Sequence, residues 1–210
     1  MLDRGNQAFG QRHGVARIGI LDRRRCVQSA LDTVESVYLT AVRAGEYYRM
    51  TYPYTVKIDA RADPPTAAED PDWNPEDVRY SVVRWAASLT RNAQGPSTSD
   101  PRTGEIIESD IVWYHNHLRS YRNRIMIETG AANPGARRLP IDDAQMCEAM
   151  RQVIAHEVGH ALGLPHNMIS SSAYPVDSLR SKSFVQRMGI APSIMDYARQ
   201  NYIAQPGDGL

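Results

Sequence analysis

The stretch HEVGHALGLPH, His156 to His166, contains three of the chain's six histidines. His156 and His160 are four residues apart, so on a helix they project from the same face and can offer ring nitrogens to one point. His166 lies too far along for an uninterrupted helix, and Gly163 provides the permissive backbone that lets the chain turn back. The spacing therefore predicts a helix that ends near Gly163 and a site made by three imidazoles.

The donor set of this predicted site favours zinc. A catalytic zinc ion takes three protein ligands plus a water, and neutral imidazole is among its preferred ligands. Glu157 directly follows the first histidine, about 100° further round the helix, where its carboxylate can face the open position of the metal. Zinc lowers the pKa of its water to roughly 7, and Glu157 would take the proton as the water attacks a carbonyl. We therefore predict one catalytic Zn²⁺ held by His156, His160 and His166, with Glu157 as general base.

Length and composition limit the other functions. A chain of 210 residues that is 42% hydrophobic is expected to form one domain with a core of its own. Lysine plus arginine and aspartate plus glutamate number 24 each, so no basic surplus points to nucleic acid or an anionic membrane. No run approaches the roughly 18 to 20 apolar residues of a membrane span, and the start MLDRGNQAFGQRHG lacks the apolar part of a signal peptide.

Periodicity predicts strands before the histidines and one helix through them. Strands are expected at residues 15–21, 54–60, 78–88 and 106–114, an amphipathic helix at 27–45, an exposed acidic and proline-rich loop at 61–77, and a tight turn at 100–105. The helix with the histidines is predicted to begin at Asp142, which forms a capping box with Gln145. Its apolar face is expected to comprise Met146, Met150, Val153 and Ile154.

The remaining cysteine, histidine and acidic residues give weaker indications of a functional site. Cys26 and Cys147 form no C-x-x-C pair, so two buried thiols are favoured over a single bridge between them. His115 and His117 lie at an expected strand end without a third partner, which favours surface or substrate-side histidines over a chelating pair. In the acidic stretch 59–77 a solvated linker is favoured over a calcium site.

The pattern H-E-x-x-H-x-x-G-x-x-H is the long zinc motif of metzincins, which also carry a methionine turn downstream. SIMDY supplies Met195 at such a turn, with Tyr197 two residues later. Together with NPEDVRYSVVRWAAS, GPSTSDPRTGEIIESDIVWYHN, AHEVGHALGL, YPVDSLRS and APSIMDYARQNYIAQPGD, these residues make the chain resemble, over roughly residues 70 to 208, the catalytic region of large bacterial extracytoplasmic zinc-dependent metzincin-type peptidases.

The resemblance implies an α+β, metzincin-like (zincin) catalytic domain. We then expect a mixed twisted sheet with a backing helix and an active-site helix in an upper subdomain at 14–163, and a lower subdomain at 164–210 with the methionine turn. Residues 1–13 are expected to be flexible. Relatives continue past the position of Tyr197 with a helix and further domains, so a longer parent protein is also an expectation.

The resemblance also assigns roles at the site. Met195 would form the floor beneath the ligands, Gly163 would shape the turn, and Tyr197 would hydrogen-bond the oxyanion of the tetrahedral intermediate. The strand near 106–113 would be the sheet edge over the cleft, where a protein or peptide substrate adds as an antiparallel strand. Localisation would be extracytoplasmic: periplasmic, secreted or at the cell surface.

Three functional hypotheses use these residues. The first is a zinc-dependent endopeptidase, which the intact Glu157 favours. The second is a catalytically inactive zinc-binding module or truncated fragment that binds extended polypeptide. The third is zinc-dependent amide hydrolysis of a non-peptide substrate, which uses the same residues and differs only in the cleft. Asn167, after the third histidine, stands where several metzincin groups carry an acidic or other characteristic residue, so the chain is not assigned to one of the best-known subfamilies.

Overall fold

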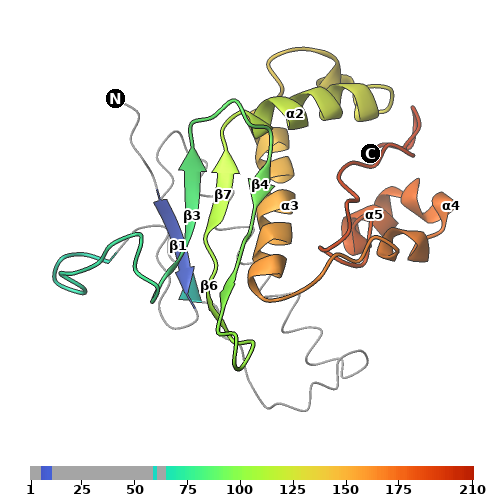
Figure 1. The fold of residues 1–210 in the computed structure, drawn as a ribbon. Helices are drawn as coiled ribbons and strands as arrows, with labels where there is room; N and C mark the ends of the chain where they lie inside the picture. Colours follow the sequence, from blue (N-terminus) through green and yellow to red (C-terminus); the bar gives the residue numbers. More distant parts are fainter. Residues whose placement is uncertain (1–5, 11–58, 61–64) are drawn as a thin grey trace.

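The computed structural model describes residues 6–10, 59–60 and 65–210 (Figure 1). The strand expected at 15–21, the helix expected at 27–45 and most of the strand expected at 54–60 lie outside the described residues. The strands are β1 (Asn6–Gly10), β2 (Asp59–Ala60), β3 (Ser81–Ala86), β4 (Ala93–Gln94), β5 (Thr98–Ser99), β6 (Ile106–Glu108) and β7 (Ile111–Tyr114). The helices and helical turns are α2 (His117–Arg124), η1 (Ile125–Thr129), η2 (Pro134–Arg137), α3 (Asp143–Ala161), η3 (Ser170–Ala173), α4 (Val176–Leu179) and α5 (Lys182–Met188).

Five strands form one sheet in the order β2-β1-β3-β7-β4. β3 and β7 run parallel, whereas the other neighbours are antiparallel. A mixed sheet combined with helices confirms the α+β class. Residues 6–9 of β1 pair with β3, and Phe9 and Gly10 pair with β2; the flexibility expected for residues 1–13 stays a prediction.

The strand predicted at 106–114 is in fact two strands. β6 pairs with β5 in a hairpin, closed by the predicted turn at 100–105, in which Gly104 has a φ of 74°. The chain then leaves the ladder because Asp110 accepts hydrogen bonds from the Val82 amide at 2.8 Å and from Nε of Arg84 at 2.9 Å. Here a carboxylate side chain takes the place of a backbone hydrogen-bond acceptor. The pattern of apolar residues in the sequence does not reveal such a bond.

The expectation that this strand is the sheet edge is also wrong. β7 lies between β3 and β4, and the outer strand of the sheet on this side is β4, which pairs with Val112 and Trp113. β4 has two residues, too few for any periodicity to be read from the sequence. It nevertheless lies next to α3 (Figure 1).

Helix α2 was not predicted from the sequence. Its composition HLRSYRNR contains few apolar residues, and it continues into the π-helical turn η1. Tyr121 and Ile125 are buried, and α2 packs against α3. His117 is buried as well, so three buried residues, each one turn apart, attach a helix that looks polar in the sequence.

Helix α3 begins and ends as the sequence predicts. The Asp142 carboxylate accepts a hydrogen bond from the Ala144 amide at 2.9 Å, whereas the Gln145 half of the predicted capping box is not formed, since Oε1 of Gln145 is buried without a partner. Gly163 has a φ of 86° and donates to the His160 carbonyl, while the Leu164 amide donates to Gly159. This pair of bonds is a Schellman motif, which turns the chain sharply at the helix end.

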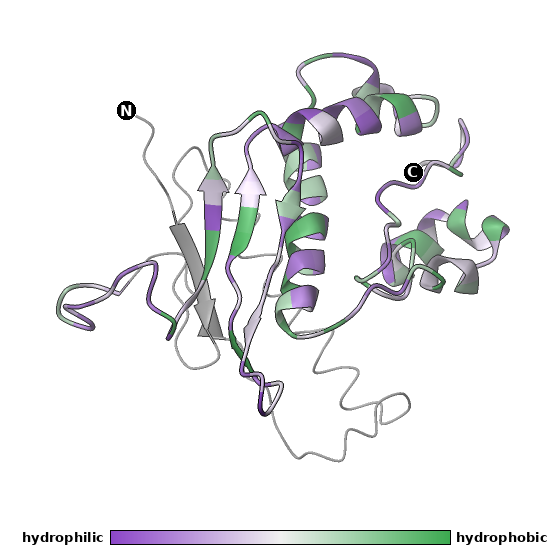
Figure 2. Ribbon diagram, viewed as in Figure 1, coloured by the Kyte–Doolittle hydropathy of each residue, from purple (hydrophilic) through white to green (hydrophobic). Residues whose placement is uncertain are grey.

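The core lies between α3 and the face of the sheet formed by β3, β7 and β4 (Figure 2). The predicted apolar face of α3 is confirmed, because Met146, Met150, Val153 and Ile154 are all buried. The other buried members of this cluster are Val83, Ala93, Ile111, Trp113, Tyr121, Ile125, Ala136, Ile141, Ala149, Ala155, Val158 and Ala161. Nearly every side of α3 is covered, as is typical of a central helix.

The segment after Gly163 lies on the side of α3 away from the sheet (Figure 1). It contains η3, α4 and α5, and two contacts attach the C-terminal residues to it. Arg180 and Asp208 form a two-pronged ion pair, and the Asn201 side chain donates to the Leu179 carbonyl at 2.6 Å. None of the helices in the described ranges is long and apolar enough to cross a membrane.

Cys147 is disulfide-bonded, so the expectation of a free buried thiol at this position is wrong. Cys26 lies outside the described residues. In the acidic loop the carboxylates contact arginines: Arg79 pairs with Asp70 and Asp77, and Arg84 pairs with Glu76. Asp70, Glu76 and Asp77 therefore have their negative charges in ion pairs with arginine.

Candidate metal centre

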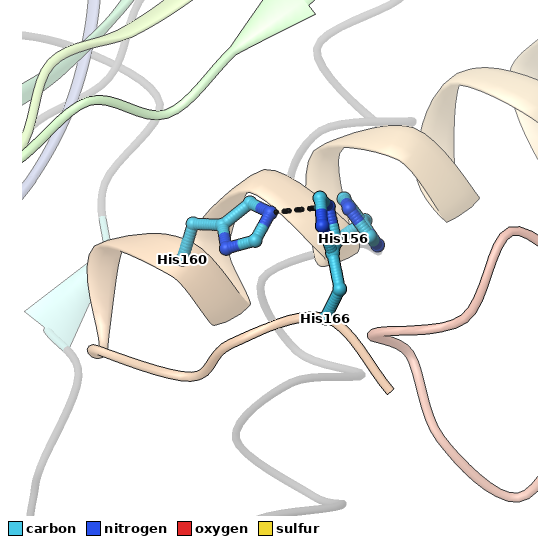
Figure 3. Close-up of side chains that lie close together, drawn as sticks. All are labelled: His156, His160 and His166. Carbon is cyan, nitrogen blue, oxygen red and sulfur yellow. Dashed lines mark hydrogen bonds between the residues drawn. The ribbon is translucent and has the colours of Figure 1, made fainter. Parts of the chain in front are cut away.

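The structure brings His156, His160 and His166 together (Figure 3). Their candidate ligand nitrogens all lie within 4.8 Å of one another, and within the described ranges this is the group of side chains suited to a metal ion. His156 and His160 come from successive turns of α3, and His166 comes from the loop that follows the Schellman turn. The local backbone thus places the third imidazole beside the first two.

Hydrogen bonds orient two of the rings. Nδ1 of His156 lies 2.7 Å from the Ile194 carbonyl, and Nδ1 of His160 lies 2.9 Å from the Leu164 carbonyl. A carbonyl accepts, so each Nδ1 carries the proton and Nε2 is left with a free lone pair. Partners of this kind fix the tautomer and the ring orientation of metal-ligating histidines.

The spacing of the free nitrogens fits a small tetrahedral ion. Nε2 of His160 and Nε2 of His166 are 3.0 Å apart. Two imidazole nitrogens on a tetrahedral zinc ion, each at about 2.0 to 2.1 Å, are roughly 3.3 Å apart. The residues present are therefore compatible with a bound zinc ion.

Burial favours the metal-binding form of the first ligand. His156 is 8% exposed, and this burial lowers the pKa of its imidazole, outweighing the opposing hydrogen bond to Ile194. A neutral imidazole has the lone pair that a metal needs, so no proton has to be removed from it at neutral pH.

Glu157 is also 8% exposed and lines the same pocket as the three histidines. Burial raises the pKa of its carboxyl group, while nearby His160 and the backbone of Gly95 oppose the shift. A Cβ at Gly95 would lie 2.7 Å from the carbonyl oxygen of Glu157. The segment after β4 therefore packs directly on the α3 backbone at Glu157, which only glycine permits.

Met195 lies beneath the histidines and is 3% exposed. A Cβ at Gly159, between the two helical histidines, would lie 2.2 Å from Sδ of Met195. The Met195 carbonyl accepts a hydrogen bond from the Asn167 amide at 3.0 Å, and the preceding Ile194 carbonyl holds His156. The methionine turn is thus attached both to α3 and to the loop that carries the third histidine.

Asp196 and Tyr197 follow in the same turn. Burial would raise the pKa of Asp196, but hydrogen bonds from the amide and hydroxyl groups of Ser171 and Ser170 hold it below its ordinary value. The Tyr197 hydroxyl lies 3.0 Å from Nε2 of His166, and the residue is 48% exposed. The hydroxyl therefore lies at the candidate metal position and remains open to the pocket.

One pocket of about 440 Å³ joins these groups. Its lining comprises Asn92, Ala93, Gln94, Gly95, Pro96, His117, Tyr121, Gln152, Val153, His156, Glu157, His160, His166, Ile194, Asp196, Tyr197 and Arg199. His115 is exposed and His117 is buried in the pocket wall, so the two do not form a chelating pair.

The sequence alone did not identify Gly95, Gln152 or Arg199 as site residues. Gly95 and Arg199 stand within the stretches that resemble metzincins, but no spacing rule distinguishes them from their neighbours. They enter the site because the segment at β4 and the methionine turn each pack against α3, and these contacts are tertiary. Gln152 on α3 donates a hydrogen bond to the Ala198 carbonyl, next to Arg199.

A buried glutamate beside three convergent imidazoles, opening into one pocket, defines a zincin-like metal site. Residues 138–210 match a family described as Met-zincin. The resemblance to metzincins is confirmed over this third of the chain, which contains the three histidines and Met195, and the family indicates a zinc metallopeptidase. No curated protein and no solved structure matches the chain significantly.

Proposed function

We propose that this chain is a zinc-dependent endopeptidase that hydrolyses peptide bonds of extended polypeptide. The observation that carries the proposal is the position of Glu157: a buried carboxylate on the same helix as two candidate ligands, in one pocket with all three. His156, His160 and His166 would hold the ion. When bound there, zinc supplies Lewis-acid chemistry, polarising the carbonyl oxygen and acidifying water.

The chain's own residues would handle the protons and the charge. Glu157 would accept a proton from the attacking water and later deliver it to the leaving amine. The Tyr197 hydroxyl, which reaches His166, would donate a hydrogen bond to the oxyanion. Met195 and Ile194 would keep the histidines in position from below, as the contacts of both residues with α3 indicate.

Strand β4 would guide the substrate. It is the outer strand of the sheet on this side, and Ala93, Gln94 and Gly95 line the pocket. A polypeptide that pairs with an exposed strand edge gains main-chain hydrogen bonds that do not depend on its sequence. Such pairing would bring the scissile carbonyl alongside α3, which β4 contacts.

We place the enzyme outside the cytoplasm, in the periplasm, at the cell surface or in the medium of a bacterium. The resemblance to exported peptidases and the disulfide bond of Cys147 both support this localisation. Disulfides persist in oxidising compartments and are rare in the cytosol.

The test compares the zinc-loaded parent chain with Glu157→Gln, Tyr197→Phe and the control Glu148→Gln on a fluorescently labelled, unfolded protein. Glu148 is exposed and pairs with Arg151 on the same helix, so its loss leaves the pocket intact. We expect Glu157→Gln to bind zinc normally and to lose about 10² to 10⁴-fold in cleavage rate, and Tyr197→Phe to lose on the order of 10²-fold. Zinc binding without cleavage by the parent would favour the inactive polypeptide-binding module instead.

A further inference from the structure

Arg199 is a positive charge in the pocket wall that has no ion-pair partner among the described residues. It is half-buried and lines the pocket with the histidines and Glu157. Its guanidinium carbon lies 4.8 Å from the centre of the Tyr197 ring, a cation–π contact. The head group is therefore held in place while its donors stay available.

The carboxylates of the pocket are engaged elsewhere. Asp196 accepts from Ser170 and Ser171, and neither Asp196 nor Glu157 forms an ion pair with Arg199. An arginine presents five donors in a planar fork that matches a carboxylate. A half-buried guanidinium without an ion-pair partner can bind an anionic ligand without first breaking another ion pair.

Two further side chains of the pocket, His117 and Tyr121, are uncharged groups that do not neutralise Arg199. His117 is 8% exposed, its Nδ1 is buried without a hydrogen-bond partner, and it lines the same pocket. Burial lowers the pKa of His117 to about 4, and the positive charge of Arg199 adds to this shift, so the two side chains are electrostatically close. Tyr121, the third group here, is 4.9 Å from the His117 ring, centre to centre.

From this geometry we propose that Arg199 is a specificity-determining residue that binds a carboxylate of the polypeptide substrate close to the candidate metal centre. The carboxylate belongs either to an aspartate or glutamate side chain near the scissile bond or to the free C-terminus of the substrate. This inference rests on the proposed peptidase function. It adds a substrate class: peptides with an acidic group within reach of Arg199.

The first arm of the test measures binding, so that it does not depend on turnover. Fluorescein-labelled ten-residue peptides carry a single glutamate scanned through the sequence, or glutamine at the same place, each with a free or an amidated C-terminus. Binding to the zinc-loaded full chain carrying Glu157→Gln is followed by fluorescence anisotropy, with Arg199→Gln, Arg199→Lys and Arg187→Gln added separately. Arg187 is exposed on α5 and does not line the pocket. Its replacement by glutamine removes the same positive charge as Arg199→Gln.

We expect one glutamate position, or the free C-terminus, to improve the dissociation constant about tenfold to hundredfold over its neutral counterpart. Arg199→Gln should abolish this difference and hardly change the affinity for the neutral peptides. Arg199→Lys should keep part of it, because lysine retains the charge but not the fork. Arg187→Gln should leave it intact. The glutamate and C-terminal series separate the two sources of the carboxylate.

The second arm measures kcat/KM of the parent chain and of Arg199→Gln on the same peptides. If the parent cuts acidic and neutral peptides equally and binding shows no preference either, carboxylate recognition is refuted while the peptidase function stands. If Arg199→Gln weakens both kinds of peptide equally, Arg199 acts through the Tyr197 ring and the inference is wrong. If the parent cuts nothing but binds acidic peptides through Arg199, the peptidase proposal fails and carboxylate recognition stands.

Discussion

Gly159 shows how much of the site depends on single residues. It lies between His156 and His160 on α3, and there is no room for a side chain because Met195 packs against its α-carbon. The HExxH pattern leaves this position open, so sequence reasoning gave it no role. The glycine is required by the approach of the methionine turn, which the sequence reveals only as a methionine at a suitable distance.

Replacing Gly159 by alanine is expected to destabilise the folded chain, the opposite of the usual effect of this change in a helix. In an exposed helix this change stabilises by up to about 1 kcal/mol. Here the new methyl group would meet Sδ of Met195 at 2.2 Å, so we expect a loss of about 1 to 3 kcal/mol in the free energy of unfolding, measured with urea. In a Met195→Ala background the same substitution should cost much less. Equal costs in both backgrounds would show that the two residues do not pack together.

Residue spacing predicted the helix, its turn at Gly163 and the three histidines, because these features depend on local geometry. Tyr197 and Met195 entered through resemblance, and the structure places both beside the histidines. Arg199 and His117 could not be predicted to meet. They come from segments far apart in the chain, and only the packing of α2 and the methionine turn around α3 brings them into one pocket.

At the scale of elements, α3 carries the site and its boundaries matter most. The predicted helix agrees with the observed one because a capping aspartate and a glycine with positive φ mark its ends. β4 and α2 were not predicted, for two different reasons. β4 is too short to show a pattern, and α2 is too polar to show an apolar face.

The cap of α3 can be tested independently of the metal. Asp142→Ala removes the acceptor for the Ala144 amide and should lower the free energy of unfolding by about 1 kcal/mol, whereas Asp142→Asn should cost only a few tenths. Urea titration of the metal-free chain measures both variants. Asp143→Ala is the matched control, because Asp143 lies inside the first turn and does not cap it. If the two alanine variants were equally stable, the cap would contribute nothing beyond charge.

At the scale of the whole molecule, the sheet, α3 and the C-terminal segment meet at one pocket. The α+β class could be predicted from the order of strands and helix. The sheet order could not, because β7 lies between β3 and β4 and the sequence does not show which strand is outermost. Long-range contacts such as the pairing of Asp110 with Val82 decide that order.

The buried His117 should make global stability depend on pH. Its pKa is lowered to about 4 by burial in the folded chain, against about 6.5 in an unfolded chain. Between these values the unfolded state binds more protons, so stability is full above pH 6.5 and is lost as the pH falls towards 4. Between pH 7.5 and 4.5 the parent should lose about 2 kcal/mol more than His117→Gln. The exposed control His115→Gln should follow the parent, and identical pH profiles for all three chains would contradict a buried neutral imidazole.

The most direct test of the central claim is the zinc affinity of the metal-free chain, measured by competition with a coloured chelator for the parent, His160→Ala and His115→Ala. The site predicts one tightly bound zinc ion per parent chain, unchanged affinity in His115→Ala, and a loss in His160→Ala beyond the roughly 100-fold that removing a supporting partner costs. Equal zinc binding by the parent and His160→Ala, or none by the parent, would contradict a metal centre at His156, His160 and His166.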